Sequence, residues 1–332
     1  MSEHKVIDET YKSQNRKMFI MGKQGIIPLL FLGLLLADKL VSNESGCING
    51  YTDIVRFRDR FFAVGTDGRI DCISKSGESE TINKSGQYKL NSAFSNDSIL
   101  IVAGEHGTIL HSTDGKRFDR TESGTDWNIH GIAFRNGLIL AGSENGTVLA
   151  SEDGQSWNQI QTRAKGDILS ISSNKSFFIG VTSAGEIIKS ADGINWEIKD
   201  YNKVYAGYNP HAKFKKILAV QNSIIIIGTH DDGSPSILFS ALGNVWVEKP
   251  PVYYDDEGML GCLTNIPNGI TYDFDRDLFY LACDNGVLFC LSNCAKCNKY
   301  LKISERNLNA VTCADHFLMI TGVDYALFFR EL

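Results

Sequence analysis

One segment recurs along this chain at a constant spacing. An apolar stretch that opens with glycine and ends in Ser-x-Asp-Gly-x-x-aromatic begins at Gly107, Gly146 and Gly185, so successive copies lie 39 residues apart. Gly68, which opens the segment GRIDCISKSG, lies another 39 residues upstream. Between the copies, apolar strand-like runs alternate with polar or glycine-containing turns. Strand-rich repeats of about 40 residues indicate the four-stranded blades of a β-propeller.

Weaker copies continue the pattern towards the C-terminus, beginning at Ile217, Ile270 and Leu308. Counting from Ile54 gives seven units, of which the last stops after its third strand, and we expect the stretch Cys47–Tyr51 to supply the fourth. The predicted fold is an all-β, seven-bladed β-propeller of four-stranded blades over residues 43–332. Its ring would close between the N-terminal and C-terminal segments, which removes exposed sheet edges. Six or eight blades are the alternatives.

Residues 1–42 precede the repeats and are predicted to form a targeting segment. The apolar run Ile26–Ala37 follows a basic stretch and has the length of a signal-peptide h-region, whereas about 20 residues are needed to span a bilayer. We expect export with cleavage after this run. The alternatives are an uncleaved anchor, which would tether the chain to a membrane, and a cytosolic extension. The predicted location is extracytoplasmic (secreted, periplasmic or lumenal) or membrane-anchored with the propeller outside.

The net charge argues against one class of partner. With 33 Lys+Arg against 39 Asp+Glu, the net charge of -6 argues against a nucleic-acid partner.

The cysteine content agrees with the predicted export. The eight cysteines are an even number, which fits an exported chain. Three of them, Cys290, Cys294 and Cys297, lie where the sixth unit lacks its Ser-x-Asp-Gly turn. We expect a disulfide there, with a metal site or free thiols as alternatives, and we predict no metal and no cofactor.

The repeated Ser-x-Asp-Gly-x-x-aromatic segment resembles the Asp-box, also called the bacterial neuraminidase repeat. A signal-like segment followed by seven such blades also resembles the photosystem II assembly factor-like propellers. We expect a structural role for the motif, with Ser and Asp bonding turn amides, Gly in the left-handed conformation and the aromatic ring packed between sheets. The motif residues are Ser112, Asp114, Gly115, Ser151, Asp153, Gly154, Trp157, Ser190, Asp192, Gly193 and Trp196.

The sequence lacks the features that a sialidase would need. Resemblance to that class implies an arginine triad and an Arg-Ile-Pro signature, and the nearest segment, Phe57–Arg60, lacks Ile-Pro. Asp273–Asp284 begins like a calcium loop, but Leu278 stands where glycine is required. We therefore predict that the protein is not an enzyme.

Two connections between repeats are longer than the period allows, and both must lie on the same face of a propeller. Tyrosine is favoured at interfaces, so we expect a protein partner to bind there. The alternative is long surface loops without a ligand. The resemblance implies an exported, non-enzymatic scaffold or assembly factor; a carbohydrate-binding or glycoside-hydrolase-like propeller, with a glycan on the tyrosines, is the second hypothesis. The candidate binding residues are Tyr201, Tyr205, Tyr208, His211, Tyr253, Tyr254, Asp255, Asp256 and Glu257.

Overall fold

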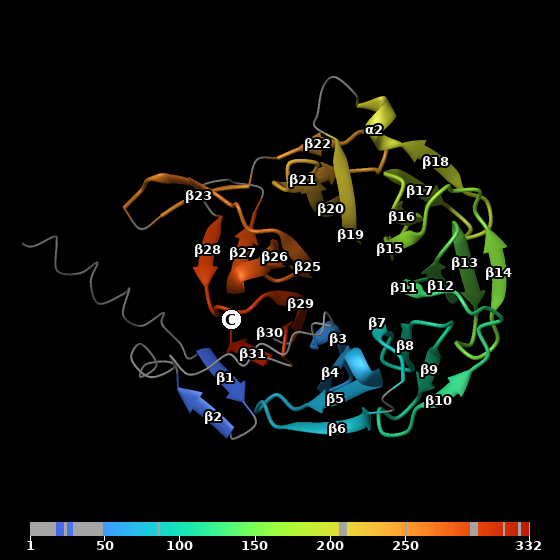
Figure 1. Ribbon diagram of the computed structural model, residues 1–332, viewed down its shortest axis with the longest axis horizontal. Helices are drawn as coiled ribbons and strands as arrows, with labels where there is room; N and C mark the ends of the chain where they lie inside the picture. The colour runs from blue at the N-terminus through green and yellow to red at the C-terminus, as the bar shows by residue number, and fades with distance from the viewer. Residues whose placement is uncertain are drawn as a thin grey trace, which may run out of the picture.

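Antiparallel sheets are arranged in a ring around a common axis in the computed structural model (Figure 1). Within each four-stranded sheet the strands follow one another in chain order from the axis outwards, and the inner strands of neighbouring sheets contact each other around the whole ring. The chain is therefore a β-propeller. The structure describes residues 18–22, 25–28, 49–84, 87–205, 211–249, 251–255, 257–292, 298–314, 316–324 and 327–331.

Six sheets of the described chain are four-stranded blades, each running from the inner to the outer strand. The first three are β3 (Tyr51–Phe57), β4 (Arg60–Gly65), β5 (Arg69–Ile73) and β6 (Ser79–Lys84); β7 (Leu90–Ser95), β8 (Leu100–Gly104), β9 (Ile109–Ser112) and β10 (Asp119–Thr121); and β11 (Ile129–Arg135), β12 (Leu138–Ser143), β13 (Thr147–Ser151) and β14 (Asn158–Gln161). The next three are β15 (Ile168–Ser173), β16 (Phe178–Thr182), β17 (Glu186–Ser190) and β18 (Glu197–Asp200); β19 (Ala212–Val220), β20 (Ser223–His230), β21 (Pro235–Ser240) and β22 (Val247–Glu248); and β25 (Pro267–Asp273), β26 (Leu278–Cys283), β27 (Val287–Leu291) and β28 (Lys299–Lys302).

The remaining sector of the ring is a five-stranded sheet, hereafter the end sheet. Its order is β2 (Gly25–Pro28), β1 (Met18–Gly22), β31 (Leu327–Glu331), β30 (Phe317–Gly322) and β29 (Leu308–Ala314). The prediction of seven four-stranded blades is therefore wrong, because only six four-stranded blades are found in the described chain. The predicted closing strand is also wrong: Tyr51 begins β3, and β1 pairs with β31 instead. The last repeat ends after three strands, so its sheet is completed from the other end of the chain.

The hydrophobic core lies between neighbouring sheets and not at the ring axis. The second strand of a blade is covered on both faces, as in β8, where every residue is buried. This agrees with its continuous apolar sequence LIVAG, which is typical of a fully buried strand. The outermost strand β14 is mostly exposed and polar. Separate apolar clusters lie at each junction, including the one between the end sheet and the first blade, so the core itself is ring-shaped.

The three repeated motifs form the same turn between the third and fourth strands. In the middle copy, the Ser151 Oγ accepts a hydrogen bond from the Gly154 amide at 2.8 Å and donates to Asp153 at 3.0 Å. The same Asp153 oxygen accepts from the amides of Gln155 and Ser156. Gly154 has φ +74°, and a Cβ there would lie 2.8 Å from Ile101 of the preceding blade. Glycine is thus required both for the conformation and for the packing.

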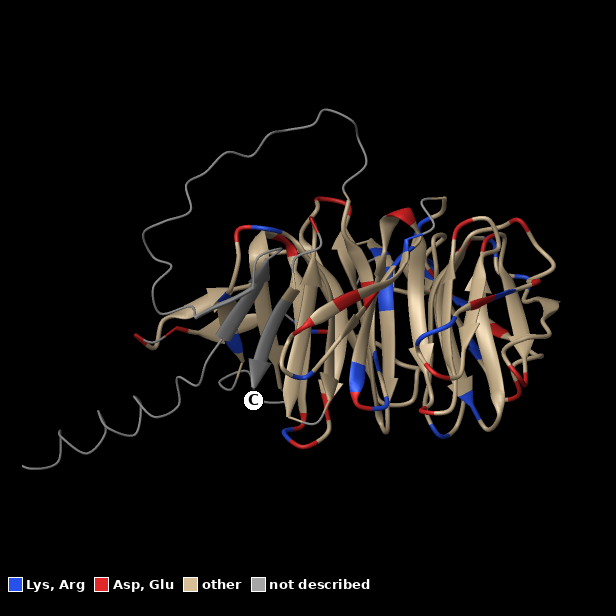
Figure 2. Ribbon diagram, turned by 90° about the horizontal axis from the view of Figure 1, so that it is seen from below, with Lys and Arg blue, Asp and Glu red and all other residues tan. Residues whose placement is uncertain are grey.

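The two faces of the ring differ in the loops that they carry (Figure 2). On one face lie the starts of the inner strands, the turns between second and third strands, and the connections between sheets; we call it the connection face. The Ser-x-Asp-Gly turns lie on the opposite face. Among the described residues, no helix is long and apolar enough to cross a membrane.

The predicted disulfide is not found in the described part of the chain. Cys290 lies buried in β27, while Cys294 and Cys297 lie outside the described residues.

Candidate binding face

The first long connection folds back against the ring. It begins with the short helix α2 (Tyr201–Val204), whose cap Asp200 accepts a hydrogen bond from the Lys203 amide at 3.0 Å. Tyr201 is only 1% exposed and packs between the fourth and fifth blades. Tyr205 stacks on Tyr201 with ring centroids 4.7 Å apart, and its hydroxyl accepts from the Trp246 amide at 2.9 Å. Tyr201 thus belongs to the core rather than to a contact surface.

The second long connection forms a separate hairpin, β23 (Val252–Tyr254) and β24 (Leu260–Cys262), at the outer edge of the ring (Figure 1). The Asn298 side chain donates to the Val252 carbonyl at 2.7 Å, and Tyr253 stacks on Tyr300 with centroids 5.0 Å apart. One side of the hairpin is therefore fixed to the sixth blade.

The tip of this hairpin is acidic and its free side is apolar. Asp255 accepts hydrogen bonds from the amides of Glu257 and Met259, which closes the turn. Tyr254, Met259 and Leu260 are 40%, 64% and 62% exposed.

The remaining candidate binding residues are His211, Tyr208 and Asp256. His211 is exposed and lies 3.5 Å from Asp231, whereas Tyr208 and Asp256 fall outside the described residues.

A histidine–carboxylate–serine cluster on the fifth blade lies next to His211. The His230 Nε2 is 2.6 Å from Glu248 Oε1, and the Ser236 hydroxyl donates to the same oxygen at 3.1 Å. In a hydrolytic triad the serine bonds the histidine, and the carboxylate bonds the other ring nitrogen. Here the histidine and the serine both bond the Glu248 carboxylate and not each other. The second ring nitrogen of His230, Nδ1, lies 3.4 Å from the His211 carbonyl oxygen. The cluster ties the loop to its blade and does not have the geometry of a nucleophile and its base.

Every inner strand carries a register shift close to its start on the connection face. A bulge of this kind re-aims the side chain of the extra residue. Four of the extra residues bond the next sheet. Thr52 donates to the Leu90 carbonyl, Asn91 to the Ile129 carbonyl at 3.0 Å, Asn268 to the Leu308 carbonyl at 2.8 Å, and Asn309 to the Tyr51 carbonyl at 2.7 Å. The residues passed over by the pairing are Thr52, Asn91, His130, Leu169, Lys215, Asn268 and Asn309.

The sequence analysis missed these residues, although a signal was present. Thr52, Asn91, His130 and Leu169 follow one another at the same 39-residue spacing as the turns. Aligning the repeats column by column would have shown that one position near the start of each inner strand is mostly polar.

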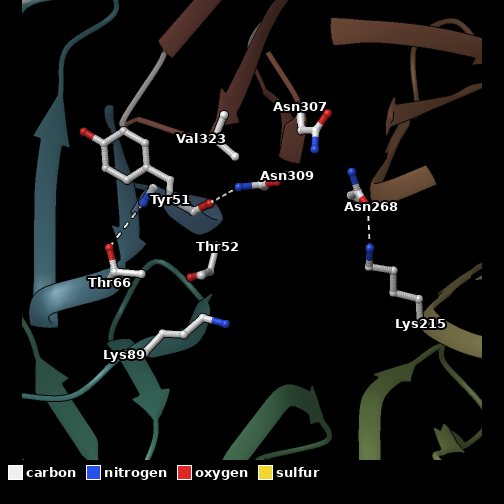
Figure 3. A pocket seen from close by; sticks show the side chains of 10 residues that line it. Tyr51, Thr52, Thr66, Lys89, Lys215, Asn268, Asn307, Asn309 and Val323 are labelled. Carbon is white, nitrogen blue, oxygen red and sulfur yellow. Dashed lines mark hydrogen bonds between the residues drawn. The ribbon is translucent and has the colours of Figure 1, made fainter. Parts of the chain in front are cut away.

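Several bulge residues line a cavity of about 250 Å³ where the ring axis opens onto the connection face (Figure 3). Thr52, Lys215, Asn268 and Asn309 contribute from four different sheets. Lys89 reaches it from the start of β7 and points to the open centre (Figure 3). The cavity thus lies on the face where the long connections begin and end, whereas the β23–β24 hairpin packs against the outer strand β28 of the sixth blade.

An ion pair crosses the axis beside this cavity. Lys216 Nζ of β19 lies 3.6 Å from Asp53 Oδ1 of β3, and these strands belong to sheets that are not neighbours in the ring. The other Asp53 oxygen accepts from the Ser92 hydroxyl at 3.2 Å and from the Ala93 amide at 3.1 Å. The carboxylate of Asp53 is therefore fully engaged.

The chain is a β-propeller with a cavity at its axis and an added hairpin at its outer edge, and comparisons with known proteins support the fold. The propeller domain of Doa1 superposes with a TM-score of 0.66 at 14% identity, covering 87% of this chain and 95% of that one. YCF48 from Cyanidioschyzon merolae gives 0.61 at 14% identity, covering 86% and 97%. A structure described as YCF48 bound to D1 peptide gives 0.63 at 18% identity, covering 86% and 95%. No family model and no curated protein sequence matches this chain.

Proposed function

We propose that this chain is a non-enzymatic propeller that binds a protein partner through the β23–β24 hairpin at the outer edge of its ring. The hairpin carries the proposal, because the blades are complete without it and yet it presents Tyr254, Met259 and Leu260 to solvent. Neighbouring exposed apolar residues with a polar rim are typical of protein interaction sites. YCF48, which shares the fold, has been described in complex with a peptide, and this supports the proposal.

The proposal includes a location and a role. The signal-like features of Ile26–Ala37 favour an exported or membrane-tethered propeller. A scaffold or assembly factor would need a stable ring and an accessible binding element. The hairpin meets the second requirement because only one of its sides packs on the sixth blade.

A site-specific photo-crosslinker tests the contact surface. It is placed at Met259 and, as a matched control, at Ile194, which is 62% exposed in a Ser-x-Asp-Gly turn of the opposite face. In cells of the source organism we expect a discrete crosslinked protein from position 259 that is not obtained from position 194. Identical products from the two positions would contradict the proposal.

The geometry favours a protein over a glycan. A sugar ring stacks on an open aromatic face, but Tyr201 is buried, Tyr205 is covered by Tyr201, and Tyr253 is covered by Tyr300. A glycan-array signal that disappears in the Tyr254→Ala variant would reverse this preference.

A further inference from the structure

The cavity at the ring axis has a lining that is unusual for an acidic protein. The chain has a net charge of -6, yet the described residues that line the cavity include Lys89 and Lys215 and no carboxylate. In the described part of the chain, neither lysine forms an ion pair with a carboxylate. Two cations at one opening therefore lack an anionic partner.

Hydrogen bonds to the protein leave donors directed at the cavity. Lys215 donates one hydrogen bond to the side-chain oxygen of Asn268, which leaves two of its three N–H groups. The oxygen of Asn307 accepts from the Asn285 amide at 2.8 Å, so its NH₂ group is turned towards the centre (Figure 3). The ammonium of Lys89 extends into the same space (Figure 3).

The carboxylate of Asp53, next to the cavity-lining Thr52, is occupied by other partners. Asp53 already pairs with Lys216 and accepts two further hydrogen bonds. Partial desolvation and the neighbouring charge of Lys216 both lower the pKa of Lys215, whose side chain is still reached by solvent, whereas Asp284 raises this pKa to a smaller extent. An anion in the cavity would relieve the unfavourable environment of this ammonium.

We propose that the mouth of the ring axis binds an oxyanion, with Lys89, Lys215 and the Asn307 amide as donors. Nitrogen donors of this kind recognise phosphate or carboxylate oxygens, and charge-assisted hydrogen bonds are the stronger ones. The oxyanion can belong to a free small molecule or to an acidic side chain of a partner. The site is independent of the hairpin, and its failure would leave the proposed function untouched.

Titration calorimetry on the purified chain at low ionic strength tests this site with three probes: inorganic phosphate, succinate and a hexaglutamate peptide. The Lys89→Gln and Lys215→Gln variants are compared with Lys116→Gln, an exposed lysine of the opposite face. Circular dichroism melting checks that each variant is folded. We expect each cavity variant to weaken binding by about tenfold or more, while Lys116→Gln binds as the unmodified chain does.

The probes separate the two sources of the oxyanion. Binding of phosphate or succinate supports the site with a small molecule as ligand, and binding of the peptide alone supports it with an acidic partner segment. The proposal is overturned if no probe binds, or if Lys116→Gln weakens binding as much as Lys89→Gln, since that would indicate unspecific attraction.

Discussion

At the scale of single residues, serine and aspartate accept different hydrogen bonds in each Ser-x-Asp-Gly turn. The buried serine hydroxyl accepts from the glycine amide and donates to the aspartate. The exposed aspartate accepts from the amides of the two residues after the glycine. In the two copies that end in tryptophan, the indole N–H also closes the turn: Trp157 donates to the Gly154 carbonyl and Trp196 to the Gly193 carbonyl, each at 3.2 Å. The serine and aspartate side chains therefore supply hydrogen-bond acceptors that the backbone of the tight turn lacks.

Replacement of Ser151 by alanine should destabilise the chain. The buried amide of Gly154 would lose its acceptor, and an unsatisfied buried group costs about 1–3 kcal/mol. Urea unfolding of Ser151→Ala would show the loss, with Ser176→Ala, an exposed serine of a different turn, as the control. Equal midpoints for the two variants would mean that the turn bond contributes nothing.

The aspartates of the turns should make stability depend on acid pH. Hydrogen bonds from the amides of Ser156 and Gln155 lower the pKa of Asp153 to about 2, and the pKa values of Asp114 and Asp192 are lowered in the same way. An unfolded aspartate titrates at about 4, so the stabilisation is complete above that pH and is lost as the pH falls towards 2.

Urea midpoints between pH 6 and pH 2.5 measure this dependence. The triple variant Asp114→Asn, Asp153→Asn, Asp192→Asn should be less stable than the unmodified chain at pH 6, and its midpoint should fall less steeply below pH 4. Parallel curves for the two proteins would rule out the turns as the origin of the acid sensitivity.

At the scale of elements, the two long connections should respond differently to truncation of their tyrosines. Tyr201 is 1% exposed, and removal of a large buried ring costs about 3–5 kcal/mol. Tyr254 is 40% exposed, so Tyr254→Ala should change stability by no more than about 0.5 kcal/mol. Chemical unfolding of the two variants would decide the matter, and a stable Tyr201→Ala protein would contradict the packing described for α2.

The repeat revealed the strands and turns but not the structure of the connections. Strand positions follow from apolar runs at fixed spacing, and the Ser-x-Asp-Gly turn is a local structure that its own side chains specify. The burial of Tyr201 depends on a helical turn folding back between two blades, and nothing in the local sequence specifies that contact. The cavity residues were missed for a similar reason, because a one-residue bulge is visible only when the pairing of two strands is known.

At the scale of the whole molecule, the ring depends on both ends of the chain. β31 pairs with β1, so deletion of residues 1–42 would leave β31 with an unpaired edge. Exposed edges promote association between chains. We expect the truncated protein to melt at a lower temperature and to form oligomers in light scattering, while deletion of residues 1–15 should have neither effect. A monomeric truncated chain with an unchanged melting temperature would show that β1 is dispensable.

Export remains a separate prediction. N-terminal sequencing of the mature protein should give a start between Asp38 and Cys47, as expected for cleavage after the apolar run. An intact Met1 on a cytoplasmic chain would contradict it. A mature chain that begins in this range lacks β1 and β2. Cleavage would therefore expose the same edge of β31 as the deletion of residues 1–42.

The pairing of β1 with β31 also has a consequence for the order of events during synthesis. The two strands are separated by on the order of 300 residues, so at about 5–20 residues per second β1 leaves the ribosome roughly 15–60 s before its partner exists. Throughout that interval the leading segment is available to any factor that recognises a nascent apolar chain. Capture for translocation therefore competes with pairing of the segment in the ring. Capture can begin as soon as the first residues emerge, so slower elongation would favour it.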